Sequence, residues 1–137
     1  MGKKLETSNH SGEMKKSVKI QSSQEKAWRK LSNIVGLPSW VVGVKKTIFL
    51  SKKKRGVGAI RKITLDDGTD IEEHIVGWKN GQYFSYIATS GLPLRAYHAT
   101  ISIKPVKKNE ITVTWQSYFN SEAMTKKEFF FGHSFAV

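Results

Sequence analysis

Residues 91–119, GLPLRAYHATISIKPVKKNEITVTWQSYF, carry the clearest structural signal of the chain. They predict two strands, residues 96–104 and 110–118, joined by a polar connection at 105–109. Apolar and polar side chains alternate along both strands, which is the pattern of a strand with one buried face. The expected inward-facing residues are Tyr97, Ala99, Ile101, Ile103, Ile111, Val113 and Trp115. Because this face must be covered, a cavity beneath it is the natural place for a functional site.

The composition is that of a single globular domain. The chain has 137 residues, 39% of them hydrophobic and 25% charged, which is enough for a core of its own. It has no cysteine, which excludes a disulfide framework, a thiolate metal site and a cysteine nucleophile. A chain without cysteine is compatible with the cytoplasm, where we expect this protein to act.

The charge is strongly positive. Lys and Arg total 23 against 11 Asp and Glu, a formal net charge of +12 that favours contact with polyanions such as nucleic acid or anionic lipid head groups. The alternative is a solvated surface rich in lysine. Most cations lie in dispersed doublets, and no RNA-recognition signature interleaves them with aromatics. The candidate contact with RNA or an anionic membrane is the single run Lys52, Lys53, Lys54 and Arg55.

The segment before the sheet has three parts. Residues 1–16 are polar and aperiodic, and predict a disordered basic tail. Residues 17–21 alternate and predict a short first strand. Residues 23–42 predict a helical segment of two short helices, because Ser22 and Glu25 have capping-box spacing and an amphipathic pattern follows until Pro38.

From residue 44 the period changes to two and remains so to residue 119. Tight turns of the Asp-Gly and Asn-Gly kinds, at residues 67–68 and 80–81, predict hairpins in a six-strand antiparallel meander. Residues 121–137 predict a short C-terminal helix that completes a single domain of residues 17–137. Its phenylalanines should pack against another surface, so this apolar tail is also a candidate homodimer contact.

This order of elements is that of the helix-grip fold, and the residues resemble the START-like, or SRPBCC, superfamily of the birch-pollen allergens. Within it they resemble the polyketide cyclase/dehydrase-like group, over roughly residues 17–120. The similar motifs are residues 23–28 (SQEKAW), Leu37-Pro38-Ser39-Trp40, Gly58 with Arg61, Glu73, Leu92-Pro93 with Tyr97, and Val113-Thr114-Trp115 with Phe119.

The resemblance implies an α+β protein in which a curved sheet grips a C-terminal helix, with an apolar cavity between them. Members bind lipids, sterols, polyketides, plant hormones or isoprenoid quinones, and some catalyse cyclisation or dehydration. This chain departs from the pattern at its end: the residues after Ser121 are fewer than the usual final helix, and Gly132 interrupts them. Closure of the cavity is therefore expected to depend on a short helix or on a partner.

Two charged residues are the leading site candidates. Arg61 and Glu73 lie at mirrored distances from the Asp67-Gly68 turn, so they should be opposite each other on paired strands. Facing the cavity, they would form a buried ion pair that orients a polar ligand group or serves as acid and base. Facing outward, they would form an exposed cross-strand pair worth well under about 1 kcal/mol.

Aromatic and amide side chains complete the expected ligand site. Tyr86 and Tyr97 would each offer a hydroxyl inside an apolar cavity, although core packing is the alternative for either. Trp40 follows the helix stop and is placed at the pocket mouth. Trp115 and Gln116 alternate, so only one of them should face inward, and a β-bulge would exchange them.

Other chemistries find no support in the sequence. The four histidines, His10, His74, His98 and His133, lack the spacing of a metal pair, so we expect no metal and no cofactor. There is no nucleophile elbow and no phosphate-binding loop. We therefore expect binding or transport of a small hydrophobic ligand such as a lipid, polyketide, isoprenoid or quinone. The alternatives are a metal-free cyclase or dehydratase using Arg61 and Glu73 in the same cavity, and a basic module for RNA, ribosome or membrane.

Overall fold

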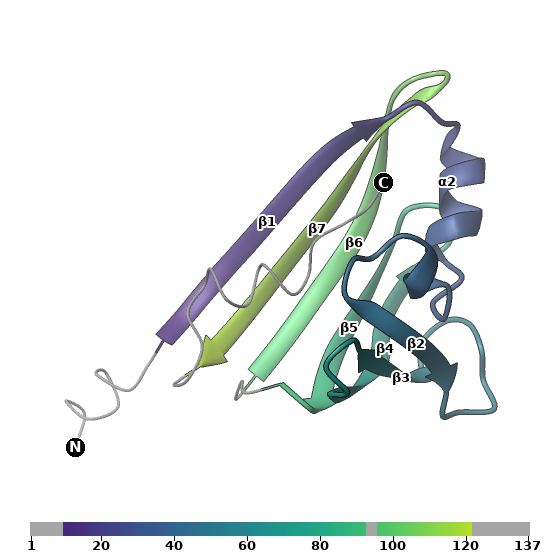
Figure 1. The fold of residues 1–137 in the computed structure, drawn as a ribbon. Coiled ribbons are helices and arrows are strands. Elements are labelled where there is room, and N and C mark those ends of the chain that lie inside the picture. The colour runs from purple at the N-terminus through teal and green to yellow at the C-terminus, as the bar shows by residue number, and fades with distance from the viewer. Residues whose placement is uncertain (1–9, 93–95, 122–137) are drawn as a thin grey trace.

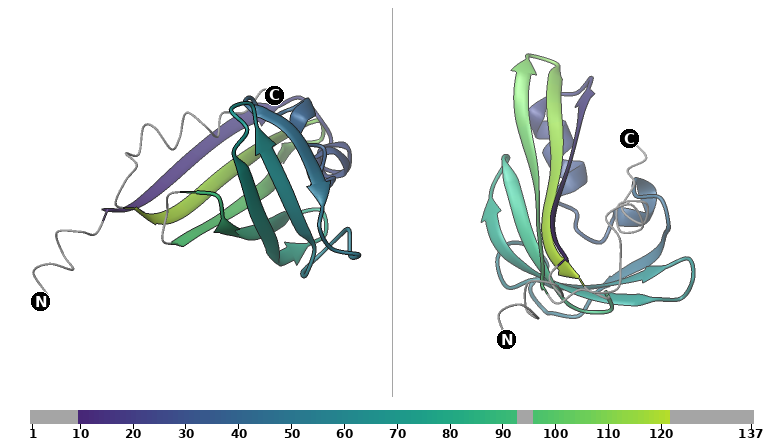
Figure 2. Two further views of the ribbon diagram at one scale, coloured as in Figure 1. Left: turned by 60° about the horizontal axis from the view of Figure 1, so that its bottom comes forward. Right: turned by 90° about the vertical axis from the view of Figure 1, so that its left-hand side faces the viewer.

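In the computed structural model, which describes residues 10–92 and 96–121, seven strands form one antiparallel sheet in the order β1-β7-β6-β5-β4-β3-β2. The sheet curls strongly, so that β1, β7 and β6 stand steeply against β2, β3 and β4 (Figures 1 and 2). Helix α2 (Gln24–Leu31) and the short helix η1 (Leu37–Ser39) lie at one end of this half-barrel. The strands are β1 (His10–Ile20), β2 (Val44–Phe49), β3 (Ile60–Leu65), β4 (Asp70–Lys79), β5 (Tyr83–Ser90), β6 (Ala96–Lys107) and β7 (Glu110–Ser121).

The alternation predicted for the last two strands is confirmed. All seven side chains expected to face inward are buried in one core beneath the concave face of the sheet. Strands β6 and β7 extend further than predicted, and the connection between them narrows to a turn at residues 108–109. The length of this pairing gives the half-barrel a steep wall against which the other elements pack.

Strand β1 begins at His10, so the disordered tail predicted for residues 1–16 was wrong for residues 10–16. The signal was weak because the inward positions there are Gly12, Met14 and Lys16, which do not form an apolar run. Pairing with β7 holds the segment in place, Met14 is buried, and the Phe119 ring lies where a Cβ of residue 12 would be.

Helix α2 is shorter than the amphipathic pattern suggested, and Ser23 rather than Ser22 caps it, through an Oγ that accepts from the backbone N–H of Lys26. Two hydrogen bonds fix the helix to the β4–β5 turn. Gln24 donates to the carbonyl of Gly81 at 2.8 Å, and the Trp28 indole N–H donates to Asn80 at 2.9 Å. The Trp28 ring also packs against Trp78 and Phe84, an aromatic cluster that the sequence pattern did not reveal.

The expected C-terminal helix lies outside the described residues, except that Ser121 ends β7. Among the helices of the described residues, none is both long and apolar enough to cross a membrane.

Candidate functional site

A small cavity of about 40 Å³ lies beneath the concave face of the sheet. Its walls come from η1, the chain after it, and strands β2 to β7, and all but two of the side chains are apolar or aromatic. The exceptions are Arg61 and Glu73. The lining residues are Leu37, Trp40, Val41, Val44, Arg61, Ile63, Leu65, Ile71, Glu73, Tyr86, Ile101 and Trp115.

Arg61 on β3 and Glu73 on β4 are directly opposite each other in the strand register, as the mirrored spacing predicted. Both are almost fully buried, with exposed fractions of 1% and 2%. The Arg61 Nε and Nη2 atoms donate to Oε1 of Glu73 at 3.0 and 2.8 Å, and Nη1 donates to the carbonyl of Ile34 at 2.8 Å. The guanidinium therefore ties the two strands to the chain that follows α2.

The two hydrogen bonds that Arg61 donates to Glu73 reach the same carboxylate oxygen, Oε1. The described residues provide no hydrogen bond to the second oxygen, Oε2 of Glu73. A guanidinium has five N–H donors, and the described residues use three of those of Arg61. The ion pair therefore keeps one acceptor, Oε2 of Glu73, and two N–H donors of Arg61 that bond to no described residue. Polar atoms of this kind beside an apolar space can recognise one polar group on a hydrophobic molecule.

Burial shifts the protonation of this group. It raises the pKa of Glu73 above its ordinary value, because the loss of hydration outweighs the opposing field of Arg61. The carboxyl group is thus a better proton acceptor than an exposed glutamate. In a site of this kind, such a group can either accept a hydrogen bond from a ligand or move a proton.

Tyr86 forms the next layer of the site. Its ring centroid lies 4.8 Å from the Arg61 guanidinium carbon, a cation–π contact, and its hydroxyl accepts from the Trp115 indole N–H at 3.0 Å. Burial raises the pKa of Tyr86 to about 12 and that of Tyr97 well above its ordinary value. Both phenols therefore stay neutral, and within the described part of the chain Glu73 is the carboxylate that pairs with Arg61.

The structure brings most of the predicted site residues together. Trp40, Arg61, Glu73, Tyr86 and Trp115 all line the cavity. Tyr97 is buried behind them, with its ring centroid 6.1 Å from that of Tyr86.

Of the two alternatives for β7, the structure turns Trp115 inward and Gln116, also named as a ligand-site candidate, away from the cavity. The alternation along β7 turns Trp115 to the concave face, and Gln116 bonds to Glu13 and Tyr118 on the convex side. No β-bulge interrupts β7 at this point in its pairing with β6, so the parity of the strand holds.

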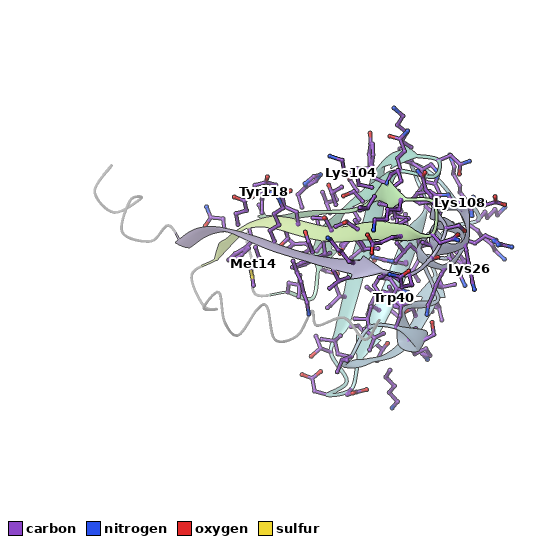
Figure 3. The ribbon with its side chains drawn as sticks, turned by 90° about the horizontal axis from the view of Figure 1, so that it is seen from above. Met14, Lys26, Trp40, Lys104, Lys108 and Tyr118 are labelled. Carbon is purple, nitrogen blue, oxygen red and sulfur yellow. The ribbon has the colours of Figure 1, made fainter. Side chains whose placement is uncertain are left out.

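A second, larger pocket lies on the other side of Trp40. It has a volume of about 300 Å³ and is formed by the end of β1, helix α2 and β7. Trp40, labelled in Figure 3, is the one residue among those described that lines both spaces. The sequence analysis did not predict this pocket, although it correctly predicted that Val113 faces inward. Its lining is Ile20, Gln21, Ser22, Lys26, Ala27, Lys30, Leu31, Trp40 and Val113.

The described residues contain no group of three or more His, Asp or Glu side chains arranged to hold a metal ion. The charged groups that line the cavity are Arg61 and Glu73, and the Tyr86 hydroxyl lies close to them.

A curled antiparallel sheet over an apolar cavity with one buried ion pair defines a ligand-cavity protein of the helix-grip class. The sequence profile described as polyketide cyclase / dehydrase and lipid transport matches residues 11–131. The chain therefore belongs to that family, which implies ligand binding. A comparison with curated protein sequences finds no match.

Solved structures support the same fold. XoxI from Bacillus cereus has a TM-score of 0.77 at 23% identity, covering 89% of this chain and 87% of its own. The aromatase/cyclase ZhuI from Streptomyces sp. R1128 has a TM-score of 0.73 at 10% identity, covering 86% and 73%. Norcoclaurine synthase from Thalictrum flavum, solved with dopamine and hydroxybenzaldehyde, has a TM-score of 0.69 at 18% identity, covering 85% and 73%. At these identities the similarity concerns the fold alone.

Proposed function

We propose that this protein binds a small hydrophobic ligand that carries a hydrogen-bond donor, such as a hydroxyl group, and that this group is held by Glu73 beneath the sheet. The observation that carries the proposal is the buried Arg61–Glu73 pair in an otherwise apolar cavity, with Oε2 left for a donor. Buried ion pairs contribute little net stability compared with apolar residues of the same volume. Stability therefore does not explain why the pair is present, whereas ligand recognition does.

The size of the two spaces determines how a ligand would fit. The cavity of about 40 Å³ is well below the roughly 300–1,000 Å³ of typical ligand pockets, whereas the neighbouring pocket reaches about 300 Å³. The polar group would enter the smaller space beside Glu73, and the apolar body would occupy the larger one. Because Trp40 stands between them, its side chain would have to turn when the ligand binds.

Two measurements test this function. Native mass spectrometry of the protein purified from its own host should show a co-purifying hydrophobic molecule. In vitro, naphthol should bind at least about tenfold more tightly than naphthalene, because a hydrogen bond to a charged group is worth about 1.5–3 kcal/mol.

The matched variants separate recognition from burial. Replacing the pair by apolar residues, Arg61→Met with Glu73→Leu, should remove the preference for naphthol while naphthalene still binds. Glu72→Gln, which changes a partly exposed neighbour paired with His74, should leave the preference intact. Equal affinity of the wild-type protein for both compounds would refute the role of Glu73.

The raised pKa of Glu73 beside the cationic Arg61 favours a second candidate function, a cyclase or dehydratase in the same cavity. Glu73 would take a proton from the carbon between the carbonyl and the hydroxyl-bearing carbon, and Arg61 would stabilise the enolate oxygen through its unused donors. When the carbonyl re-forms, the bond from the β-carbon to its hydroxyl breaks, and the hydroxyl takes the proton back from Glu73 and leaves as water. The test is turnover of a small β-hydroxyketone. Activity should fall by about 10²–10⁴-fold in Glu73→Gln while binding is retained. If the wild-type protein binds the β-hydroxyketone but does not turn it over, the enzymatic function is refuted and ligand binding is the one that remains.

A further inference from the structure

The meander collects positive charge at one end of the molecule. In an antiparallel meander the β2–β3, β4–β5 and β6–β7 turns lie at the same end of the sheet. The first of these turns carries Lys52, Lys53, Lys54 and Arg55 in succession, and all four are exposed. The other two add exposed cations, which are Lys79, Lys107 and Lys108.

Helix α2 joins this end and extends it. Its hydrogen bonds from Gln24 and Trp28 reach the β4–β5 turn, so the helix is fixed beside that turn. Lys26 and Lys30, both exposed and one helical turn apart, therefore belong to the same surface. Figure 3 shows Lys26 and Lys108 at this end of the molecule. We call this surface the basic end and define it by residues 52–55, Lys26, Lys30, Lys79, Lys107 and Lys108.

Few carboxylates oppose these cations. Glu25 and Glu110 are the acidic residues in the described turns and helix of this end, and Glu110 accepts a hydrogen bond from Gln21. The opposite end is different, because the β3–β4 turn holds Asp66 and Asp67 and is followed by Asp70. Among the described residues, the turns at the two ends of the sheet therefore differ in charge: one end is strongly basic and the β3–β4 turn is acidic.

Exposed aliphatic side chains lie among the cations. Leu50 and Val57 flank the β2–β3 turn with exposed fractions of 46% and 51%, and Val106 precedes the β6–β7 turn at 46%. Large exposed aromatics, on which nucleic-acid bases stack, do not accompany them in the described part of this end. Trp78 is half-buried and already covered by Arg55, whose guanidinium carbon lies 5.3 Å from its ring centroid.

We propose that the basic end docks on an anionic membrane surface. Lysines and arginines near such a surface are attracted to its anionic lipids, and aliphatic side chains insert at the level of the head groups. This combination fits a lipid bilayer better than RNA, which is recognised through stacking aromatics together with cations. This docking surface is formed by the three turns and helix α2, and it does not depend on the identity of a ligand.

Docking would also bring the larger pocket to the membrane. Two of its lining residues, Lys26 and Lys30, belong to the basic end, and the pocket is built at the end of β1 beside α2. This step rests on the proposed function, because it concerns the exchange of a hydrophobic ligand with the bilayer. The attraction of the surface to membranes holds with or without it.

Vesicle co-sedimentation of the full chain tests the proposal. The protein should bind phosphatidylcholine vesicles that contain phosphatidylserine, bind poorly to phosphatidylcholine alone, and dissociate as salt rises. Replacing Lys52, Lys107 and Lys108 by Gln should weaken binding about 100-fold, or roughly fivefold for each lysine. The control replaces Lys15, Lys45 and Lys46 by Gln, which removes the same charge away from the basic end and should have a much smaller effect.

The outcomes separate the alternatives. Leu50→Ser with Val57→Ser leaves the charge unchanged and should also weaken vesicle binding. Equal losses for the two triple variants would overturn the proposal, since binding would then follow net charge and not the basic end. Tight binding of single-stranded RNA with no binding to anionic vesicles would overturn it in favour of an RNA surface. Naphthol binding is unaffected by either result, so failure here is distinct from failure of the proposed cavity.

Discussion

Arg61 and Glu73 are expected to be costly to separate and inexpensive to replace together. Arg61→Met alone leaves a buried carboxyl group without its cation and removes the bond to the Ile34 carbonyl. We expect a loss of about 3–5 kcal/mol in the free energy of unfolding, measured by urea denaturation. Combining it with Glu73→Leu should recover most of that loss. If the double variant stays as unstable as the single one, the pair contributes to the fold itself and its assignment to ligand recognition is weakened.

Tyr86 should make the protein sensitive to alkali. Its pKa is raised from 10.0 to about 12, so between these values the unfolded chain ionises while the native phenol keeps its proton. The native state then binds more protons, and stability falls as pH rises through this window, by about 3 kcal/mol for two pH units. Tyr86→Phe lacks this contribution.

Urea denaturation of the wild type and of Tyr86→Phe at several pH values tests whether stability falls as the pH rises. Near pH 8 the Tyr86→Phe variant should be less stable by about 1 kcal/mol, because the Trp115 indole loses the hydrogen bond to the hydroxyl. The difference should shrink above pH 10 and reverse before pH 12, because the loss of about 3 kcal/mol in the wild type exceeds the contribution of the hydrogen bond. Tyr118→Phe, at an exposed position on the convex face, is the control and should follow the wild type. A stability difference that stays constant with pH would show that Tyr86 ionises normally.

The turn after β5 needs glycine at residue 91 for two reasons, a positive φ and a close approach to the backbone of β4. Gly91 has φ of +95°, and a Cβ there would overlap the carbonyl oxygen of Asp70 on β4. Gly68 in the β3–β4 turn has φ of +89° with no atom within 4 Å of such a Cβ. Gly68→Ala should therefore cost only about 1–2 kcal/mol for the left-handed backbone. Gly91→Ala should destabilise the protein clearly more than Gly68→Ala, because the added Cβ would push the turn away from the backbone of β4. Thermal denaturation of the two variants compares them, and equal losses would contradict the close approach.

Strand β7 shows both the reach and the limit of prediction from sequence. Its alternation correctly buried Ile111, Val113 and Trp115, because a half-buried strand needs apolar side chains on one face. The same parity turns Gln116 outward, and only the absence of a bulge, which sequence does not reveal, decides that point. Mirrored spacing about a tight turn likewise paired Arg61 with Glu73, since turn geometry fixes the register.

The periodicity of the sequence did not predict contacts between segments that are far apart in the chain. Strand β1 is defined by its pairing with β7, whose partner residues lie about a hundred positions away in the chain, and its own side chains give little signal. The packing of Trp28 on Trp78, and the pocket between α2 and β7, also depend on how the sheet curls. The sequence therefore predicted elements and faces, whereas the enclosed spaces follow from the curvature of the whole sheet.

Trp40 lines both the small cavity that holds the Arg61–Glu73 pair and the larger pocket beside helix α2. Trp40→Ala should join the two spaces and cost about 3–5 kcal/mol of stability, as expected for truncation of a buried tryptophan. The joined space should accept longer molecules. In a thermal-shift series of linear fatty alcohols, whose hydroxyl group can donate to Glu73, the chain length that stabilises the variant most should therefore be longer than for the wild type.

Trp28→Ala is the matched control for that experiment. Trp28 is also buried, at 6% exposure, but it borders neither space among the residues that line them. Its truncation should lower stability by a similar amount without changing the preferred chain length. If Trp40→Ala also keeps the wild-type preference, the two spaces do not act as one site. A ligand would then have to be accommodated in the larger pocket alone, out of reach of Glu73.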